Sequence, residues 1–414
     1  MMPIHSRRAF LAAGVATGML AAPFIRSARA ASPGLKLGCL TDLNGPYADL
    51  TGQGSIGSIK LAIEDFGKLH PEIPVELTYA DFSLKPDTGL SIMRGWLDND
   101  GVDAVLDFPM SALALAAGRV LEEKNKVGLI TSAATSELTR GGCGPNHIQF
   151  ASDTYALAAS LVKTIVQQGG DSWFFILPNY ELGKSMVSDA SRAVVEAGGK
   201  VVGTVAYAFP GTTDFSSYLL QAQNSGAKVL CLANAGDETI TSVKQAAEFG
   251  LLSGGMKLAI PFMAEPAIKA LGLKAAQGIY FSAPFYWDKN AGTRGFSDRL
   301  VKLVPNQRPN KNFANAYSGA LHYLKAAAAM GVEKAKADGR AAVLQMKAMP
   351  THDALFGVGN IRLDGQAMRD MLLLKVKSPE QSHDPFDYCS IELQIGAQQA
   401  ARPLAEGGCK LVKA

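Results

Sequence analysis

Two serines stand at positions where an α/β protein binds anions. Ser111 and Ser132 each follow a short apolar run that predicts a strand, in the segments Phe-Pro-Met-Ser-Ala and Ile-Thr-Ser-Ala. Open α/β sheets bind ligands beyond the carboxyl ends of their strands, where loop hydroxyls and the free N–H groups of a following helix can hold a carboxylate. Neither serine lies in a G-x-S-x-G elbow, and no histidine or acid stands at a spacing typical of a triad. The pattern therefore favours binding over hydrolysis, with a helix N-cap as the alternative role of Ser111.

A literal G-x-G-x-x-G motif occurs at Gly52, Gly54 and Gly57, with Asp81 at the end of the next predicted strand. A dinucleotide site needs the first glycine in the turn directly after the first strand, so that the helix N-terminus faces the pyrophosphate. About ten residues separate Gly52 from the strand predicted at 35–41. We therefore interpret the glycines as the start and inner face of a packed helix.

The chain has five cysteines and six histidines, without Cys-x-x-Cys, His-Glu-x-x-His or clustered histidine spacing. A dedicated zinc or iron site has no support from this pattern, and we expect no cofactor. Cys39 and Cys231 lie in apolar, strand-like runs and are expected to be buried thiols. Cys143 and Cys409 both lie in glycine-rich segments, which favours a disulfide between them, and Cys389 with Cys409 is the competing pair.

The N-terminus predicts export. Ser6-Arg7-Arg8-Ala9-Phe10-Leu11 precedes an uncharged stretch and a small-x-small site ending at Ala30. This arrangement resembles a twin-arginine signal cleaved after Ala30, although both arginines could serve an ordinary secretory signal. The uncharged stretch of about 17 residues is shorter than the ~20 that span a bilayer, so we expect an exported, periplasmic protein.

The charge of the remaining chain disfavours a nucleic-acid partner. The 414 residues carry a net charge of +3, and 1–30 hold four arginines and no acid, so removing them leaves a net charge of −1. A nearly neutral protein lacks the basic excess that binding to phosphate backbones requires.

Strands and helices alternate in two series, the pattern of β-α-β units around mostly parallel sheets. The first series has predicted strands at 35–41, 75–79, 104–107 and 127–130, and helices at 52–69, 87–97 and 113–124. The second has predicted strands at 173–177, 200–206, 229–233 and 258–260, and helices at 154–168, 183–197, 215–224 and 239–249. A helical region at 312–349 precedes a tail of short strands. The sequence therefore predicts two similar three-layer α/β lobes.

Several segments together make the chain similar to type I periplasmic solute-binding proteins of ABC transporters, the branch with the leucine/isoleucine/valine-binding proteins. They are LTDLNGPY at 40–47, SAATSELT at 132–139, SDTY at 152–155, NYELG at 179–183, LANAGD at 232–237, FYWD at 285–288 and RPLAE at 402–406. The resemblance covers about 35–413 and implies two lobes that close on a small solute and deliver it to a membrane permease. It also implies three crossovers, with one lobe at 32–150 plus 283–350 and the other at 151–282 plus 351–414. We expect a monomer on the same ground.

The resemblance also implies which residues meet the solute. Those matching the carboxylate-binding elements are Ser111, Ala112, Ser132, Ala133 and Thr135. Those matching the cleft wall, or lying where the chain returns between the lobes, are Tyr47, Tyr155, Tyr180, Asn234 and Tyr286. An acidic residue of the second lobe binds the ammonium group in amino-acid receptors of the family, and Glu265 or Asp237 matches that role.

A branched-chain-type amino acid is therefore the expected solute. If neither Glu265 nor Asp237 enters the cleft, an aromatic carboxylate or a short amide fits better. An exported α/β enzyme is the remaining alternative, supported by the fold class alone.

Overall fold

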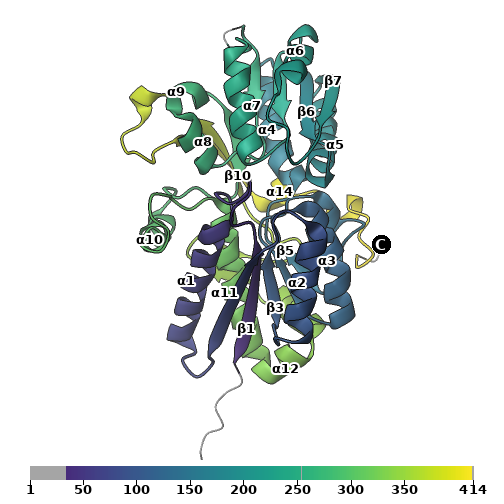
Figure 1. The fold of residues 1–414 in the computed structure, drawn as a ribbon, viewed down its shortest axis with the longest axis vertical. Helices are drawn as coiled ribbons and strands as arrows, with labels where there is room; N and C mark the ends of the chain where they lie inside the picture. Colours follow the sequence, from purple (N-terminus) through teal and green to yellow (C-terminus); the bar gives the residue numbers. More distant parts are fainter. Residues whose placement is uncertain (1–33, 253, 413–414) are drawn as a thin grey trace, which may run out of the picture. The chain divides into compact units, whose positions relative to one another are not determined.

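The structure, a computed structural model, describes residues 34–252 and 254–412. The predicted export signal at 1–30 lies outside the described residues. The described chain forms two α/β lobes, each built on its own sheet, and most strand pairs are parallel (Figure 1). The predicted fold class is therefore confirmed.

The first lobe has a five-stranded parallel sheet in the order β2-β1-β3-β4-β5. Its strands are β1 (Leu35–Thr41), β2 (Val75–Asp81), β3 (Ala104–Asp107), β4 (Val127–Ile130) and β5 (His147–Gln149). Its helices are α1 (Gly52–Leu69), α2 (Pro86–Asp98), α3 (Ser111–Lys124), α10 (Ala291–Leu300), α11 (Lys311–Met330), α12 (Val332–Ala337) and α13 (Gly339–Ala348). Alternate side chains of β1 point to opposite faces. Leu37 and Cys39 join the core beneath α1 and α11, whereas Leu40 joins the core beneath α2 and α3 (Figure 1).

The second lobe has a seven-stranded sheet in the order β14-β13-β10-β9-β8-β6-β7. Its strands are β6 (Ser172–Pro178), β7 (Lys200–Tyr207), β8 (Val229–Leu232), β9 (Lys257–Ala259), β10 (Tyr280–Ala283), β13 (Met371–Val376) and β14 (Cys389–Ile395). Its helices are α4 (Thr154–Gln167), α5 (Glu181–Glu196), α6 (Ser216–Asn224), α7 (Asp237–Glu248), α8 (Glu265–Leu271), α9 (Leu273–Ala276) and α14 (Ala397–Ala400). β13 and β14 pair antiparallel, so the tail closes one edge of an otherwise parallel sheet.

The chain passes between the lobes three times. It leaves the first sheet after β5, returns after β10 to form α10–α13, and leaves again to form β13. Between these last two elements, a small hairpin of β11 (Thr351–Asp353) and β12 (Gly357–Gly359) stays beside the first lobe, where Ser318 donates to Asp353. Gln366 also bridges to Gln149 of β5. We therefore propose that the third crossover lies beyond Gln366, rather than at the predicted 350–351.

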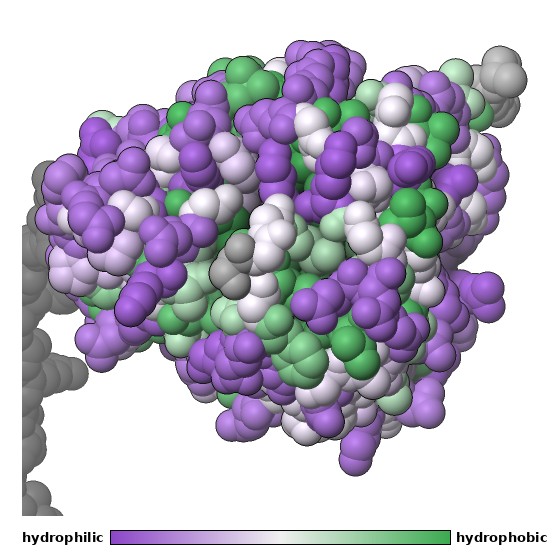
Figure 2. Space-filling view, turned by 90° about the horizontal axis from the view of Figure 1, so that it is seen from above, coloured by the Kyte–Doolittle hydropathy of each residue, from purple (hydrophilic) through white to green (hydrophobic). Residues whose placement is uncertain are grey.

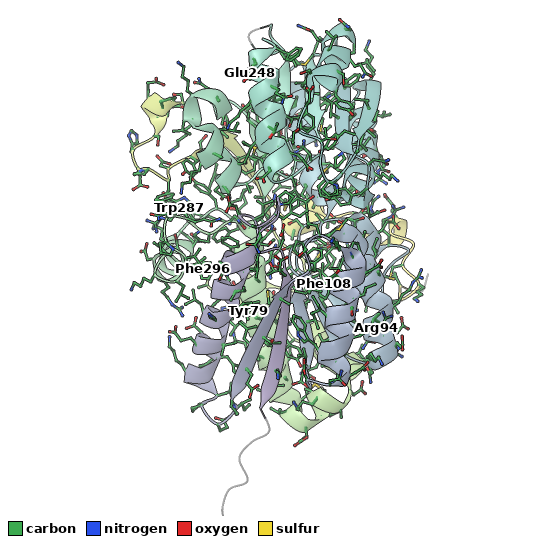
Figure 3. All side chains as sticks on the ribbon, in the orientation of Figure 1. Tyr79, Arg94, Phe108, Glu248, Trp287 and Phe296 are labelled. Atoms are coloured by element: carbon green, nitrogen blue, oxygen red, sulfur yellow. A yellow bond between two sulfur atoms is a disulfide. The ribbon has the colours of Figure 1, made fainter. Side chains whose placement is uncertain are left out.

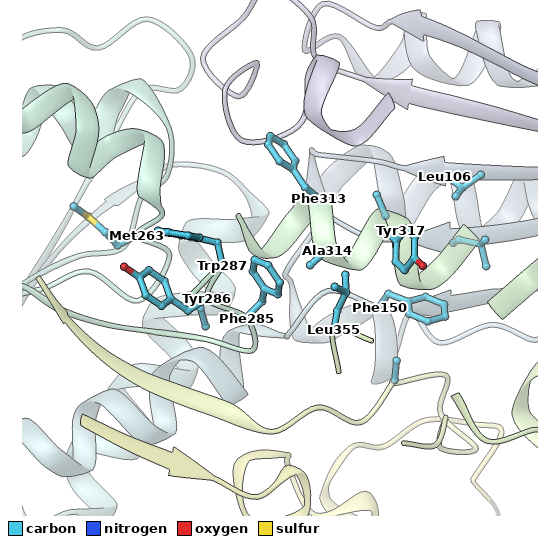
Figure 4. Packing of buried hydrophobic residues seen from close by; sticks show 14 of the residues in the cluster. Leu106, Phe150, Met263, Phe285, Tyr286, Trp287, Phe313, Ala314, Tyr317 and Leu355 are labelled. Atoms are coloured by element: carbon cyan, nitrogen blue, oxygen red, sulfur yellow. The ribbon is translucent and has the colours of Figure 1, made fainter. Parts of the chain in front are cut away.

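The glycines of the G-x-G-x-x-G motif are packing residues, as predicted. Gly52 begins α1 with φ +47°, and its N–H donates to Thr41 Oγ1 at 2.9 Å. A Cβ on Gly54 would lie 1.9 Å from the Phe313 ring of α11. The missing side chain therefore allows α11 to pack directly on α1, and Figure 4 shows Phe313 with Ala314 and Tyr317 on that helix.

A disulfide joins Cys143 to Cys409, the pair favoured by the sequence, with 5.7 Å between the Cα atoms. Cys39, Cys231 and Cys389 are buried free thiols. The bond fixes the C-terminal tail to the loop before β5. No helix in the described ranges is long and apolar enough to span a membrane. On the face in Figure 2, apolar residues occur in small groups among polar ones.

Candidate functional site

A narrow pocket, partly open to solvent, lies between residues of both lobes, with a cavity volume of about 10 Å³. The first lobe contributes Tyr47, Leu50, Thr51, Pro109, Ser111, Ser132, Ala134 and Asn312, and the second contributes Leu182, Ala235 and Phe262. Most of these residues follow the carboxyl end of a strand or begin the next helix, which is where parallel sheets bind ligands. The structure thus brings three predicted residues together, namely Tyr47, Ser111 and Ser132.

The loop that presents Ser111 has an unusual backbone. Asp107 ends β3 with φ +84°, and Phe108 follows with φ +57°, a region that side chains other than glycine rarely adopt. Phe108 lies beyond the arrowhead end of the first sheet (Figure 3). The buried Asp107 carboxylate accepts hydrogen bonds from Thr131 and Ser132. Burial raises the pKa of Asp107, and the Ser132 hydrogen bond opposes that rise. These bonds hold the strained turn in place.

Ser132 has both of its donors committed to Asp107. Its hydroxyl donates to the Asp107 carboxylate and its N–H donates to the Asp107 carbonyl at 3.2 Å. A hydroxyl has one hydrogen, so Ser132 has none left for a ligand carboxylate in this arrangement. Its direct role is to position the loop.

Ser111 retains a free donor. It is 1% exposed and is the first residue of α3, and no hydrogen bond from its hydroxyl occurs within the described chain. The N-cap position belongs to Met110, so the alternative N-cap role of Ser111 is wrong. The first N–H groups of a helix, including that of Ala112, lack intrahelical partners and carry the positive end of the helix dipole.

Ala133 and Ala134 complete this donor set. Their main-chain N–H groups have no hydrogen-bond partner among the described residues. Together with the Ser111 hydroxyl and the start of α3, they can bind a carboxylate by neutral, oriented donors. A buried cation is not needed, which avoids part of the desolvation penalty of an ion pair.

Aromatic side chains from both lobes form the other side of the site. The hydroxyls of Tyr47 and Tyr180 lie 2.6 Å apart, one from each lobe. Phe209 stacks on both rings, with centroid distances of 5.8 Å to Tyr47 and 4.5 Å to Tyr180. Sequence reasoning missed Phe209, because a lone aromatic residue in the loop after β7 has no periodicity or motif to mark it.

Two other predicted residues support loops or join the lobes. The Thr135 hydroxyl donates to Glu181 of the second lobe at 2.8 Å. The Asn234 amide lies within the turn after β8, accepting from Thr239 and donating to Ser242. Neither residue lines the pocket.

Two predicted aromatic residues lie elsewhere. The Tyr155 ring packs under Arg402 and Arg192, with the Arg402 guanidinium 4.5 Å from the ring centre. Tyr286 is 3% exposed and its hydroxyl accepts from the N–H of Cys389. Figure 4 shows Tyr286 within a buried aromatic cluster beside Met263.

The predicted ammonium partners also lie outside the pocket lining. Asp237 is exposed. Glu265 is 4% exposed, and burial raises its pKa to about 7, with Lys311 opposing that rise. Burial likewise lowers the pKa of Lys311 to about 7, and its ammonium donates to the Met263 carbonyl at 3.2 Å.

Comparison with known proteins identifies the family to which this architecture belongs. A family model for periplasmic binding proteins matches residues 34–382. A periplasmic binding protein from Burkholderia mallei is 37% identical with a TM-score of 0.87, over 92% of this chain and 99% of that one. The chain belongs to the periplasmic binding protein family. No curated protein was matched.

Two further solved structures are similar to this chain. A branched-chain amino acid ABC transporter periplasmic ligand-binding protein from Burkholderia xenovorans is 36% identical, with a TM-score of 0.80, over 91% of this chain and 99% of that one. A solute-binding protein from Rhodopseudomonas palustris in complex with benzoate is 18% identical, with a TM-score of 0.79 and the same coverage, and shares the fold.

As a periplasmic binding protein, the chain is a solute receptor of an ABC transporter and not an enzyme. Such receptors bind small molecules and deliver them to ABC permeases, and membership implies export to the periplasm. The pocket between the lobes is therefore the candidate solute site.

Proposed function

We propose that this receptor captures a small carboxylate-bearing solute, a branched-chain-type amino acid, between its two lobes. The observation that carries the proposal is the donor set formed by the Ser111 hydroxyl, the start of α3 and the N–H groups of Ala133 and Ala134. Of these donor residues, Ser111 and Ala134 line the pocket, and the second-lobe lining is apolar, with Leu182, Ala235 and Phe262. Such a pocket suits an anionic group at one end of the solute and an aliphatic body at the other.

The similarity to the Burkholderia xenovorans protein supports the amino-acid assignment, because that protein is 36% identical over nearly the whole chain. An aromatic carboxylate is the second candidate, and the absence of both Glu265 and Asp237 from the pocket lining favours it. The stack of Tyr47, Tyr180 and Phe209 favours it, since an aromatic solute could pack against these rings.

Closure around the solute is the expected mechanism. Contacts between the lobes already include the Tyr47 to Tyr180 hydroxyl pair and the Thr135 to Glu181 hydrogen bond. A solute that touches both lobes stabilises the closed state by its difference in affinity for the closed and open forms. We infer that the closed form, acting as a monomer, is what the permease receives.

Thermal unfolding with a panel of solutes tests the proposal. The panel contains leucine, isoleucine, valine, benzoate, 4-hydroxybenzoate, short amides and NAD. A ligand at ~1,000 times its Kd stabilises the folded state by about 4 kcal/mol, which raises the unfolding temperature by several degrees. We expect the aliphatic amino acids to give the largest shift. A shift with benzoates alone would transfer the assignment to the second candidate, and a shift with NAD alone would contradict both.

We also propose that residues 1–30 direct export, by the twin-arginine route, and are removed after Ala30. The test is the mass of the protein recovered from the periplasm. Replacement of Arg7 and Arg8 by lysine should block export if the twin-arginine route is used, and should leave it intact if an ordinary secretory signal is used.

A further inference from the structure

Asp107 is a buried acid that lies one side chain away from the solute pocket. It ends β3 and is fully buried. The Ser132 hydroxyl, which lines the pocket, donates to Asp107 Oδ1, and the Thr131 hydroxyl donates to the same oxygen at 3.2 Å. The other oxygen, Oδ2, has no hydrogen-bond partner among the described residues. Ser132 therefore lies between an incompletely paired carboxyl group and the place where a solute carboxylate binds.

The neighbours that act most strongly on Asp107 are uncharged. Burial raises the pKa of Asp107, and the hydrogen bond from Ser132 lowers it. The hydroxyls of Thr41 on β1 and Ser55 on α1 lie close enough to lower it further. Cys39 of β1 is a titratable neighbour, but burial, followed by Asp107, raises the pKa of its thiol, which stays neutral at ordinary pH. Hydroxyls compensate a buried negative charge less well than a cation does, so protonation is an accessible alternative for this carboxyl group.

The protonation state of Asp107 determines what the Ser132 hydroxyl can do. A hydroxyl has one hydrogen to donate and two lone pairs that accept. An ionised Asp107 accepts the hydrogen of Ser132, as in the structure. A protonated Asp107 is itself a donor, so Ser132 Oγ can accept from it and turn its own hydrogen toward the pocket. Protonation also removes a negative charge that repels a solute carboxylate.

We propose that Asp107 is a positioning residue that controls carboxylate binding through Ser132, because a proton on Asp107 reverses their hydrogen bond and makes the Ser132 hydroxyl a donor to the solute. The inference rests on the proposed function, since it requires a carboxylate-bearing solute, and it holds for an amino acid and for an aromatic acid alike. The proton comes from solvent and stays on Asp107 while the solute is bound. The carboxyl O–H is the one covalent bond that forms.

Solute binding and proton uptake are therefore coupled. A bound carboxylate favours the protonated form of Asp107, so the pKa of Asp107 is higher in the complex than in the free receptor. The affinity is highest at low pH. It falls as the pH rises between these two pKa values, by at most about tenfold for each pH unit, and is constant above them.

Other buried groups of the described chain also titrate near neutral pH, and those named here do not line the pocket. Burial raises the pKa of Asp153 to about 6, of Glu265 to about 7 and of Glu238 to about 8. Burial lowers the pKa of Lys311 to about 7. Proton linkage through these groups survives the replacement of Asp107, whereas linkage through Asp107 does not.

The test is calorimetric titration of the full receptor with leucine and with benzoate at pH 5, 6, 7 and 8. Each titration is repeated in two buffers with different heats of ionisation, because the difference in heat gives the number of protons taken up. The variants are Asp107→Asn and Ser132→Ala. Asparagine has the same shape, adopts the positive φ of this position and does not ionise. Asp100→Asn is the matched control, since Asp100 is exposed and precedes the other end of β3.

We expect the wild type to bind the solute more tightly at pH 5 than at pH 8 and to take up protons on binding. Asp107→Asn should lose both the pH dependence and the proton uptake, whereas Asp100→Asn should behave as the wild type. Ser132→Ala should bind more weakly than the wild type at pH 5 and nearly as well at pH 8. A purely structural role of Ser132 would weaken binding equally at both pH values.

Proton uptake that is unchanged in Asp107→Asn would overturn the inference and leave the proposed function standing. A wild-type affinity that does not fall between pH 5 and pH 8 would do the same. Should Asp107→Asn fail to fold, an affinity ratio of wild type to Ser132→Ala that is equal at pH 5 and pH 8 would overturn the inference. Binding of neither leucine nor benzoate at any pH would overturn the proposed function as well.

Discussion

Ser111 and Ser132 carry the same hydroxyl but differ in what it is free to do. The Ser132 hydroxyl donates to the buried Asp107 carboxylate, whereas the Ser111 hydroxyl has no partner within the described chain. Both residues line the pocket. Their substitutions should therefore separate solute binding from stability.

Ser111→Ala should weaken binding of the solute about 5- to 30-fold, because one hydrogen bond to a charged group contributes about 1 to 2 kcal/mol. It should leave the unfolding temperature of the free receptor nearly unchanged. Ser132→Ala should lower the free energy of unfolding by about 1 to 3 kcal/mol, because Asp107 loses a buried donor. Calorimetric titration and thermal unfolding of both variants measure this. Equal loss of affinity without loss of stability in Ser132→Ala would contradict the assignment.

The raised pKa of Glu238 predicts how the free energy of unfolding of the solute-free receptor depends on pH. Its folded pKa is about 8, above the ordinary glutamate value of 4.5, so the folded state holds a proton that the unfolded chain releases at lower pH. The stability that this group contributes is complete below about pH 4.5 and is lost as the pH rises through about 8. Glu238→Gln should therefore stabilise the free receptor at pH 9 by at least about 1 kcal/mol, since one pKa unit corresponds to about 1.4 kcal/mol.

Thermal unfolding of the wild type and of Glu238→Gln at pH 5 and pH 9 checks this sign. The free energy of unfolding of Glu238→Gln, relative to that of the wild type, should be higher at pH 9 than at pH 5. The control Glu248→Gln should show no such gain, because its side chain is exposed. A variant that loses stability at pH 9 would show that the carboxylate is paired in the free receptor.

The sequence could predict Ser111 as a ligand-binding residue, but it could not predict which hydrogen-bond donors around it are free. Ser111 lies just past a short apolar run, so the expected place of the strand end marked it. The commitment of Ser132 to Asp107, and of Asn234 to Thr239, depends on positive φ angles and turns that no local pattern reports.

At the scale of elements, hydrophobic patterning predicted most helices and strands closely. The helix expected at 52–69 is α1, and the strand expected at 35–41 is β1, because both have clear apolar periodicity. The start of α3 was expected two residues late, since Ser111 and Ala112 do not mark a helix by themselves. β5 and β10 were missed because short buried strands lack alternation.

The packing of α1 on α11 gives a prediction with a control in the same helix. Gly54→Ala puts a Cβ into the Phe313 ring, whereas Gly67→Ala meets no atom within 4 Å. Gly54→Ala should reduce the free energy of unfolding by about 1 to 3 kcal/mol through overpacking. Gly67→Ala should instead be neutral or stabilise by up to about 1 kcal/mol, because alanine favours a helix. Denaturant unfolding of both variants measures the difference, and equal effects would argue against the close approach of the two helices.

At the scale of the molecule, the C-terminal tail is tied to both lobes. Cys409 is bonded to Cys143 of the first lobe, and Arg402 pairs with Asp189 on α5 of the second. The segment 143–409 is therefore a closed loop, and closing a long loop reduces the entropy of the unfolded chain. The sequence could favour the disulfide between Cys143 and Cys409, because both cysteines lie in glycine-rich segments. It could not predict the pairing of Arg402 with Asp189, because no local pattern links two residues so far apart in the sequence.

Replacing Cys143 and Cys409 by serine should lower the free energy of unfolding by about 2 to 4 kcal/mol. Thermal unfolding with and without a reductant measures this, and the reductant should lower the unfolding temperature of the wild type but not that of the double variant. The same unfolding temperature for the wild type under both conditions would contradict a stabilising role for the bond.

The central claim is that the pocket between the lobes recognises a carboxylate. The most direct measurement is calorimetric titration of the wild type with leucine and with 3-methylbutylamine, which is leucine without its carboxylate, repeated with Ser111→Ala. The account predicts saturable binding of leucine at one site per chain, no measurable binding of the amine, and weaker leucine binding by the variant. Equal binding of the amine and leucine, with no effect of Ser111→Ala, would contradict it.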